Sequence, residues 1–121
     1  MRRLLIAISI LLCCGSAEAF TTEASFYTVA SCLKESGQYR MSNGRLLDDS
    51  KATAASWDFP LGTRIKVKCG DREVVVSVTD RGPNRKLYRS GRKIDLSLAA
   101  AKALGMVEKG IAKVTVEKWD T

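Results

Sequence analysis

The strand pattern between positions 63 and 79 limits the fold of this chain more than any other feature. Apolar side chains recur at every second position of residues 63–69 with basic ones between them, as in a half-buried β-strand. Gly70-Asp71 is a tight-turn signal. Residues 73–79 continue as a second strand, whose Val74-Val75-Val76 run predicts burial on both faces. The segment therefore predicts a β-hairpin in a β-rich domain.

The rest of the sequence predicts two more strands and one helix. Residues 24–29 and 111–118 are two further expected strands. Residues 98–104 predict a helix, with Ser97 as its N-cap and Gly105 as its C-terminal stop. The polar stretch 34–50 is expected to be a long loop of functional importance. Short strands around one short helix favour a small all-β fold, either a barrel or a sandwich.

The N-terminal residues have the pattern of an export signal. Arg2 and Arg3 precede an apolar run over residues 4–14, and Ala17-Glu18-Ala19 supplies a cleavage site. We therefore expect residues 1–19 to be a signal peptide and residues 20–121 to be one domain, exported to the periplasm or cell envelope. The run is too short to cross a bilayer, for which about 20 residues are needed, and no later segment is as long. A retained membrane anchor and lipidation at Cys14 are the alternatives.

Removal of the signal leaves two cysteines, Cys32 and Cys69. Two cysteines in an exported chain predict one disulfide, which would stabilise the fold by about 4 kcal/mol through loop entropy. The alternative is a pair of buried free thiols. A metal site built on two cysteines alone is disfavoured.

The chain contains no histidine. This excludes Ser-His-Asp and Cys-His catalysis and removes the commonest zinc ligand. Carboxylate chemistry, a Ser-Lys arrangement or no catalysis remain, and we expect no metal and no cofactor. The formal net charge of +7 favours anionic partners. Export and the lack of a basic stretch interleaved with aromatic residues argue against nucleic acid.

Polar residues interrupt apolar surroundings at three places. They are Asp80-Arg81-Gly82-Pro83, residues 93–97 around Asp95, and Asp48-Asp49. Each has an ordinary structural explanation: a turn residue, a helix cap and a solvated loop, respectively. Each is also a candidate site for carboxylate chemistry.

Several of these segments together resemble the rare lipoprotein A (RlpA-like) family. The motif Thr79-Asp80-Arg81-Gly82-Pro83 is followed by Lys93-Ile94-Asp95-Leu96-Ser97 and an alanine-rich helix. Four further motifs lie upstream, in the same order as in that family: Ala24-Ser25-Phe26-Tyr27, Asn43-Gly44, Thr53-Ala54-Ala55 and Phe59-Pro60-Leu61-Gly62-Thr63. The resemblance covers the chain from Ala24 to Glu117.

The resemblance implies a six-stranded double-psi β-barrel and a lytic transglycosylase that cleaves peptidoglycan, typically glycan strands without peptides. We separately expect the chain to be a monomer. By position, Asp80 matches the catalytic aspartate of the family. Asp48 and Asp95 match acidic positions around its cleft, and Asp95 also resembles the essential aspartate of expansin-like barrels. Ser56 is a departure, because family members usually carry a histidine there.

One carboxyl group can in principle carry out this reaction. It protonates the glycosidic oxygen and then accepts the proton of the sugar's own C6 hydroxyl, which attacks C1. We assign both steps to Asp80, and contact with Arg81 would lower the pKa of Asp80. The expected supporting or substrate-binding residues are Asp48, Ser56, Asp95, Tyr27 and Arg81. Tyr27 and Trp57 are candidates for stacking on sugar rings. The alternatives are a non-catalytic, expansin-like wall-binding module and a secreted inhibitor or effector.

Overall fold

The computed structural model describes residues 19–32 and 38–119, so the predicted signal peptide lies outside the described residues except for Ala19. This part of the chain contains six strands and three short helices. In chain order they are β1 (Phe20–Phe26), α2 (Val29–Cys32), β2 (Thr53–Ser56), β3 (Arg64–Cys69), β4 (Arg72–Asp80), α3 (Arg85–Arg89), β5 (Arg92–Leu96), α4 (Leu98–Leu104) and β6 (Ala112–Lys118).

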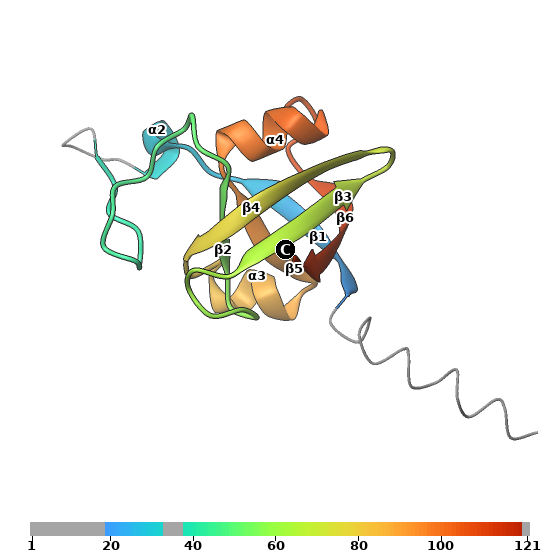
Figure 1. Cartoon of the computed structure of the whole chain (residues 1–121), viewed down its shortest axis with the longest axis horizontal. Helices are drawn as coiled ribbons and strands as arrows, with labels where there is room; N and C mark the ends of the chain where they lie inside the picture. The colour runs from blue at the N-terminus through green and yellow to red at the C-terminus, as the bar shows by residue number, and fades with distance from the viewer. Residues whose placement is uncertain (1–18, 33–37, 120–121) are drawn as a thin grey trace, which may run out of the picture.

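The six strands close into a barrel in the order β1-β5-β2-β4-β3-β6 (Figure 1). The β1–β5 and β2–β4 pairs are parallel, and the other four pairs are antiparallel. Closure leaves no unpaired edge in the sheet. The predicted six-stranded barrel is confirmed, and the sandwich that the strand pattern also allowed is excluded.

The barrel interior is filled by the alternating apolar residues. Ile65 and Val67 of β3 face inward beside Val76 of β4, and all three are at most 1% exposed. Val74 and Val75 are only half-buried, so the expected burial of this run on both faces is wrong. In a small closed barrel, every second residue of a strand lies on the outer face, where the wall has only partial cover.

The predicted helix is confirmed as α4. The Ser97 hydroxyl accepts a hydrogen bond from the Ala100 amide, and Gly105 ends the helix with a left-handed φ of 72°. The helices α2 and α3 were not predicted, because four and five residues are too few to show helical periodicity. Figure 1 shows α3 and α4 at opposite ends of the barrel.

The expected Cys32–Cys69 disulfide is wrong, because both cysteines are free thiols. Cys32 ends α2, whereas Cys69 pairs with Arg72 at the tip of the β3–β4 hairpin. Figure 1 shows α2 and this hairpin tip on opposite sides of the molecule. A disulfide requires Cα atoms within about 7 Å, which this arrangement does not allow.

Part of the expected loop 34–50 is described, and it is ordered by local contacts. Arg40 and Leu46 form an isolated β-bridge around the turn at Asn43-Gly44. Further on, Asp49 turns inward and accepts a hydrogen bond from the Val29 amide at 2.9 Å. The loop is thereby fixed against the start of α2. Among the described residues, no helix has the length and apolar character needed to cross a bilayer.

Candidate active site

Four residues from four neighbouring strands lie in one row across the barrel wall. Ser25 of β1 pairs with Asp95 of β5, and Asp95 pairs with Ala55 of β2. Ala55 pairs in turn with Asp80 of β4. Residues that pair directly on neighbouring strands present their side chains on the same face. The row therefore places the two aspartates on either side of a small alanine.

A bulge in β4 brings Asp80 into this row. Simple alternation would send Asp80 into the core with Val76 and Val78. The register shifts, however: Ala54 pairs with Val78, whereas Ala55 pairs with Asp80, so β4 carries one extra residue. Such bulges re-aim side chains. Here the bulge turns Asp80 to the outer face, where the following contacts hold it.

The Asp80 carboxylate accepts four hydrogen bonds. Its Oδ1 atom accepts from the Ser42 amide at 2.9 Å, the Ser42 hydroxyl at 2.8 Å and the Arg81 amide at 2.9 Å. Its Oδ2 atom accepts from the Tyr27 hydroxyl at 3.0 Å. Only 2% of the residue is exposed. The carboxylate is thus fixed in orientation and covered by the turn that carries Ser42.

Arg81 turns away from its neighbour. Its guanidinium Nη1 donates to the backbone carbonyls of Ser56 at 2.8 Å and Phe59 at 2.7 Å. No cation lies within ion-pair distance of Asp80 in the described part of the chain. Arg81 therefore holds the loop after β2 and is not a charge partner of the carboxylate.

Asp95 is the more accessible carboxyl of the pair. Its neighbours Ile94 and Leu96 lie in the core, so its side chain points outward. Its Oδ1 atom accepts from the Ser25 hydroxyl at 2.5 Å. Burial raises the pKa of Asp95, the Ser25 hydrogen bond and Arg92 act against this, and the charge of Asp80 adds to it. Asp95 thus retains its proton to higher pH than an exposed aspartate.

Two tyrosines stand beside the carboxylates. Tyr27 and Tyr39 pack edge to face, with their ring centroids 6.2 Å apart. Burial and the nearby Asp80 carboxylate raise the pKa of Tyr39 to about 12, and the same causes raise that of Tyr27. Both phenols therefore remain protonated at neutral pH, and Tyr27 serves as a hydrogen-bond donor. Tyr27 therefore lies beside Asp80, and its role in stacking on a sugar ring stays a prediction.

Gly82 lies over the centre of the row. A Cβ atom at this position would be 3.5 Å from the Ala55 Cβ and 4.0 Å from an Asp95 carboxylate oxygen. Its φ of 155° is one that L-residues rarely adopt. Both distances are ordinary van der Waals contacts, so the positive φ, and not a lack of space, favours glycine here.

Two of the expected site residues lie apart from this row. Ser56 pairs with Ile94, a core residue, and is therefore on the opposite face of β2 from Ala55. It is 1% exposed, and its hydroxyl accepts from the Asp58 amide at 3.0 Å. Asp48 is exposed and accepts from the amide and hydroxyl of Ser50, which lower its pKa. Neither side chain contacts Asp80.

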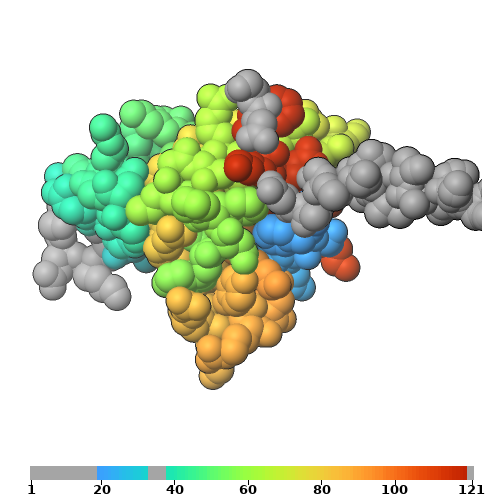
Figure 2. Space-filling view, turned by 60° about the horizontal axis from the view of Figure 1, so that its bottom comes forward, coloured from blue at the N-terminus to red at the C-terminus, as the bar shows by residue number. Residues whose placement is uncertain are grey.

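The loop after β2 is joined to α3 by aromatic contacts. The Trp57 indole donates to the Pro83 carbonyl at 2.6 Å, and the Arg85 guanidinium lies 3.9 Å from the centre of its ring. The Tyr88 hydroxyl donates to the exposed Asp58 at 2.6 Å. Figure 2 shows the segment around residue 60 (green) beside α3 and its neighbours (orange). Trp57 is half-buried and acts here as a structural link.

Sequence reasoning missed Ser25, Ser42 and Tyr39 as members of the site. Ser25 lies in a motif that the resemblance includes, but its pairing with Asp95 was not visible from the sequence alone. Ser42 and Tyr39 come from the polar loop, which carries no periodicity. Across the described residues, no group of three or more acidic or cysteine side chains is placed to hold a metal ion.

Comparison with known proteins shows the family of this chain. A family model described as lytic transglycolase matches residues 14–116. The chain belongs to this family. Its RlpA-like relatives include a probable endolytic peptidoglycan transglycosylase of Nostoc sp., 42% identical over 61% of this chain, and an endolytic peptidoglycan transglycosylase of Vibrio cholerae, 42% identical over 63%. The chain spans only 19% and 28% of these two relatives, so the match concerns one part of longer proteins.

Solved structures share the barrel at low sequence identity. A papain inhibitor from Streptomyces superposes with a TM-score of 0.63 at 22% identity, over 84% of this chain and 94% of the inhibitor. An expansin from Clavibacter michiganensis superposes with a TM-score of 0.64 at 17% identity, over 84% of this chain and 50% of the expansin. These similarities support the double-psi β-barrel fold of this lytic transglycolase family member and carry no information on activity.

Proposed function

We propose that this chain is an endolytic peptidoglycan lytic transglycosylase whose reaction takes place at the Asp80–Asp95 pair. The family membership and the names of its RlpA relatives support the reaction class. The observation that carries the proposal is the row in which two carboxylates flank Ala55 on the outer face of the barrel. We further propose that residues 1–19 are removed on export, and that residues 20–121 act as a monomer in the cell envelope.

The reaction needs a proton donor and no external nucleophile. A carboxylic acid protonates the glycosidic oxygen, so that the bond from C1 of N-acetylmuramic acid to the leaving oxygen breaks. The C6 hydroxyl of the same sugar attacks C1, and its proton returns to the carboxylate. The products are a 1,6-anhydromuramyl end and a new free 4-hydroxyl end. The carboxyl group finishes in its starting protonation state.

Asp95 suits these proton transfers better than Asp80, to which the sequence assigned them. Its raised pKa favours the protonated form that a general acid requires. Asp95 is only partly buried, whereas Asp80 is 2% exposed. Asp80 already accepts four hydrogen bonds, so its oxygens are occupied by protein donors. We therefore propose Asp95 as the group that donates and then accepts the proton.

Asp80 acts on the same reaction through its charge and its contacts. Its negative charge contributes to the raised pKa of Asp95. The positive charge that develops on the sugar ring during cleavage would also be stabilised by a nearby fixed carboxylate. Asp80 additionally anchors Ser42 and Tyr27, which border the row.

The direct test is product analysis with purified protein. Peptidoglycan and peptide-free glycan strands are each incubated with the wild type, Asp95→Asn, Asp80→Asn and a control, Asp71→Asn, at the exposed hairpin tip. We expect 1,6-anhydromuramyl products from the wild type and the control. Both site variants should lose at least about 100-fold in rate, as is usual on removal of a general acid.

The activities of the two variants distinguish the role of Asp80 from that of Asp95. If Asp95→Asn retains wild-type activity while Asp80→Asn is inactive and folded, the proton transfers belong to Asp80. Wild-type protein that binds insoluble peptidoglycan but releases no product at any pH would contradict the enzyme and support a wall-binding module. Hydrolysed ends without the anhydro bridge would contradict the transglycosylase mechanism itself.

A further inference from the structure

A second bulge in the barrel lies beside the active-site row. Ala24 of β1 pairs with Ile94 of β5, and both residues lie in the core. The next pair along is Glu23 with Arg92, so β5 carries one extra residue at this point. Glu23 is exposed, and directly paired residues present their side chains on the same face. The bulge therefore turns Arg92 to the outer face, on which the active-site row also lies.

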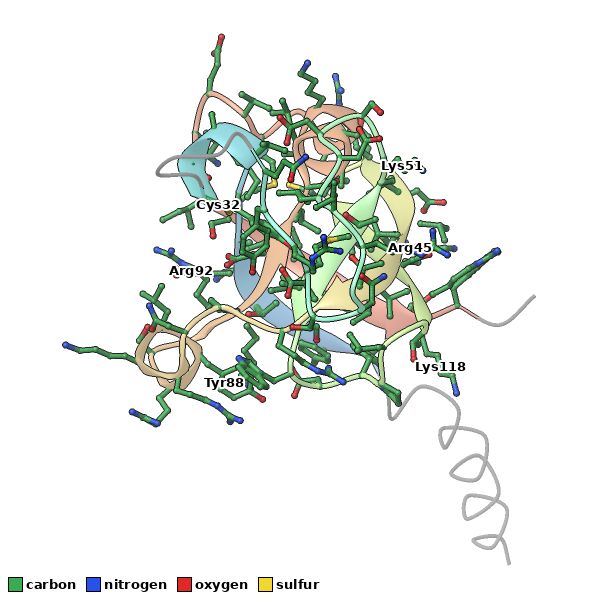
Figure 3. The ribbon with its side chains drawn as sticks, turned by 90° about the vertical axis from the view of Figure 1, so that its left-hand side faces the viewer. Cys32, Arg45, Lys51, Tyr88, Arg92 and Lys118 are labelled. Carbon is green, nitrogen blue, oxygen red and sulfur yellow. The ribbon has the colours of Figure 1, made fainter. Side chains whose placement is uncertain are left out.

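Arg92 lies near Asp95 without forming an ion pair with it. The charge of the Arg92 guanidinium opposes the rise in the pKa of Asp95 that burial causes. In the described part of the chain, neither Asp95 nor the exposed Glu23 lies within ion-pair distance of Arg92. Figure 3 shows Arg92 on the side of the molecule that carries Tyr88, away from Arg45. The edge of the row therefore holds a cation that no described carboxylate neutralises.

The Arg92 side chain also has hydrogen-bond donors without acceptors. Its Nε atom is buried and donates to no described residue. An unpartnered buried donor is rare in folded proteins, and each one calls for an explanation. The terminal nitrogens of this half-buried residue also have no described acceptor, and they are open to a ligand. A guanidinium group that meets a carboxylate with two N–H donors forms a bidentate, charge-assisted pair. Arg92 is therefore suited to bind a carboxylate.

The proposed substrate carries an acidic group on the same sugar ring that reacts. N-acetylmuramic acid bears a lactyl ether on its O3 atom, and the bond that breaks is at C1 of this ring. In peptide-bearing strands the lactyl carboxyl group is an amide, because it is joined to the stem peptide. In peptide-free strands it is a free carboxylate. A muramyl ring placed with its C1 atom at Asp95 therefore brings this group to the edge of the row, where Arg92 lies.

We propose that Arg92 is a specificity-determining residue that binds the free lactyl carboxylate of N-acetylmuramic acid in peptide-free glycan strands. The inference rests on the proposed function, and it gives a physical cause for the expected preference for strands without peptides. An amide at this position is neutral, so it leaves the guanidinium without a counter-charge. The exposed Glu23, which pairs with Arg92, weakly opposes the binding of a second carboxylate.

Recognition is tested with two forms of the same peptide-free glycan strands. One has free lactyl carboxylates, and in the other each carboxylate is converted to its methylamide, which removes the charge without adding a peptide. We expect wild-type kcat/KM for anhydro ends to be about tenfold higher with the free acid. Arg92→Gln should reduce this preference to below about twofold, and Arg92→Lys should retain part of it. Arg89→Gln, at the exposed end of α3, is the matched control and should keep the wild-type preference.

The ratio between the two substrates is the decisive quantity. Loss of the Arg92 charge also acts on the pKa of Asp95, and this changes the rate on both substrates alike. Glu23→Gln removes the negative charge that pairs with Arg92, so it should increase the preference about twofold, a gain that loss of folding cannot produce. Equal cleavage of acid and methylamide by the wild type, or a preference that Arg92→Gln leaves unchanged, would overturn the proposal.

Binding separates this inference from the proposed function. The disaccharide N-acetylglucosaminyl-N-acetylmuramic acid lacks the bond that the reaction cleaves, and NMR titration compares its free-acid and methylamide forms. We expect the acid to shift the signals of Arg92 in the wild type and to bind at least about tenfold more weakly to Arg92→Gln. If this holds while no strand gives anhydro products, the Arg92 inference is correct and the enzyme proposal is not. If anhydro products form equally fast from acid and methylamide strands, the reverse holds.

Discussion

The surroundings of Asp95 and Asp48 shift the pKa values of these two carboxyl groups in opposite directions. Burial dominates at Asp95 and raises its pKa above the ordinary value of 3.8. The hydrogen bonds from Ser50 dominate at the exposed Asp48 and lower its pKa. For Asp95, the folded chain keeps a proton at pH values where the unfolded chain has lost it. Its ionisation therefore opposes folding as the pH rises.

Replacement of each aspartate by asparagine should show these opposite signs. The free energy of unfolding of Asp95→Asn, relative to wild type, should increase as the pH rises from 3.8 through the raised folded value. For Asp48→Asn the same difference should decrease as the pH rises to 3.8, because the wild type gains stability there. Urea denaturation at a series of pH values measures both. Parallel profiles for the two variants would contradict the assignment.

The Tyr27 hydroxyl should contribute measurably to stability through its contact with Asp80. Tyr27→Phe keeps the ring contact with Tyr39 and leaves Asp80 Oδ2 without its donor. A hydrogen bond to a buried charged group is worth about 1.5–3 kcal/mol, so we expect a loss in that range by urea denaturation. Tyr88→Phe is the control, since its partner Asp58 is exposed. Its loss should be below about 1 kcal/mol.

At the scale of elements, the N-cap of α4 also contacts a strand of the barrel. Its N-cap, Ser97, accepts from the Ala100 amide at 3.3 Å and also from the Thr53 amide of β2 at 3.1 Å. One hydroxyl oxygen therefore joins the helix to a strand that is distant in the sequence. The cap of α3, Asn84, accepts only from the Leu87 amide within its own helix.

Loss of the Ser97 cap should therefore cost more than loss of the Asn84 cap. Ser97→Ala removes the cap and leaves the partly buried Thr53 amide without an acceptor, so we expect a loss of about 2–3 kcal/mol. Asn84→Ala should cost about 1 kcal/mol or less, because its helix end is exposed. Thermal and urea unfolding of both variants check this. Equal losses would show that the contact to β2 contributes nothing.

Some elements of the barrel could be predicted from the sequence, and others could not. The 63–79 hairpin and α4 follow from alternation and from capping residues, which are local signals. β2 and β5 span only four and five residues, and β2 contains two alanines, so neither carries a clear period. The bulge that turns Asp80 outward depends on its pairing with Ala55, a residue of another strand. The site was therefore found by resemblance, and its geometry only by the structure.

At the scale of the whole molecule, closure of the barrel replaces a covalent crosslink. Every strand has two hydrogen-bonded neighbours, and the interior is filled by aliphatic residues. Cys69 packs against this core as a small apolar side chain, and Cys32 lies in α2 on the other side. The fold is therefore closed by strand pairing and core packing, without a bond between the two thiols.

The free thiols give a simple test. Alkylation in denaturant without reductant, followed by peptide mapping, should modify both Cys32 and Cys69. The urea midpoint should be the same with and without reductant, because no bond is broken. A Cys32–Cys69 crosslinked peptide, or a midpoint that falls on reduction, would contradict the described structure. Cys32→Ser should change the free energy of unfolding by no more than about 1 kcal/mol, as expected for a half-buried position outside the core.

The first and last strands of the barrel are hydrogen-bonded neighbours, with Phe20 opposite Val116. A short glycine-serine linker could therefore join residue 119 to residue 19, while new ends are opened at Gly70 in the β3–β4 hairpin. Such a circular permutant would keep all six strand pairings and both aspartates in place. The coding sequence could begin with β4, and the domain could be tethered to a surface from either new end with its strand order in space unchanged.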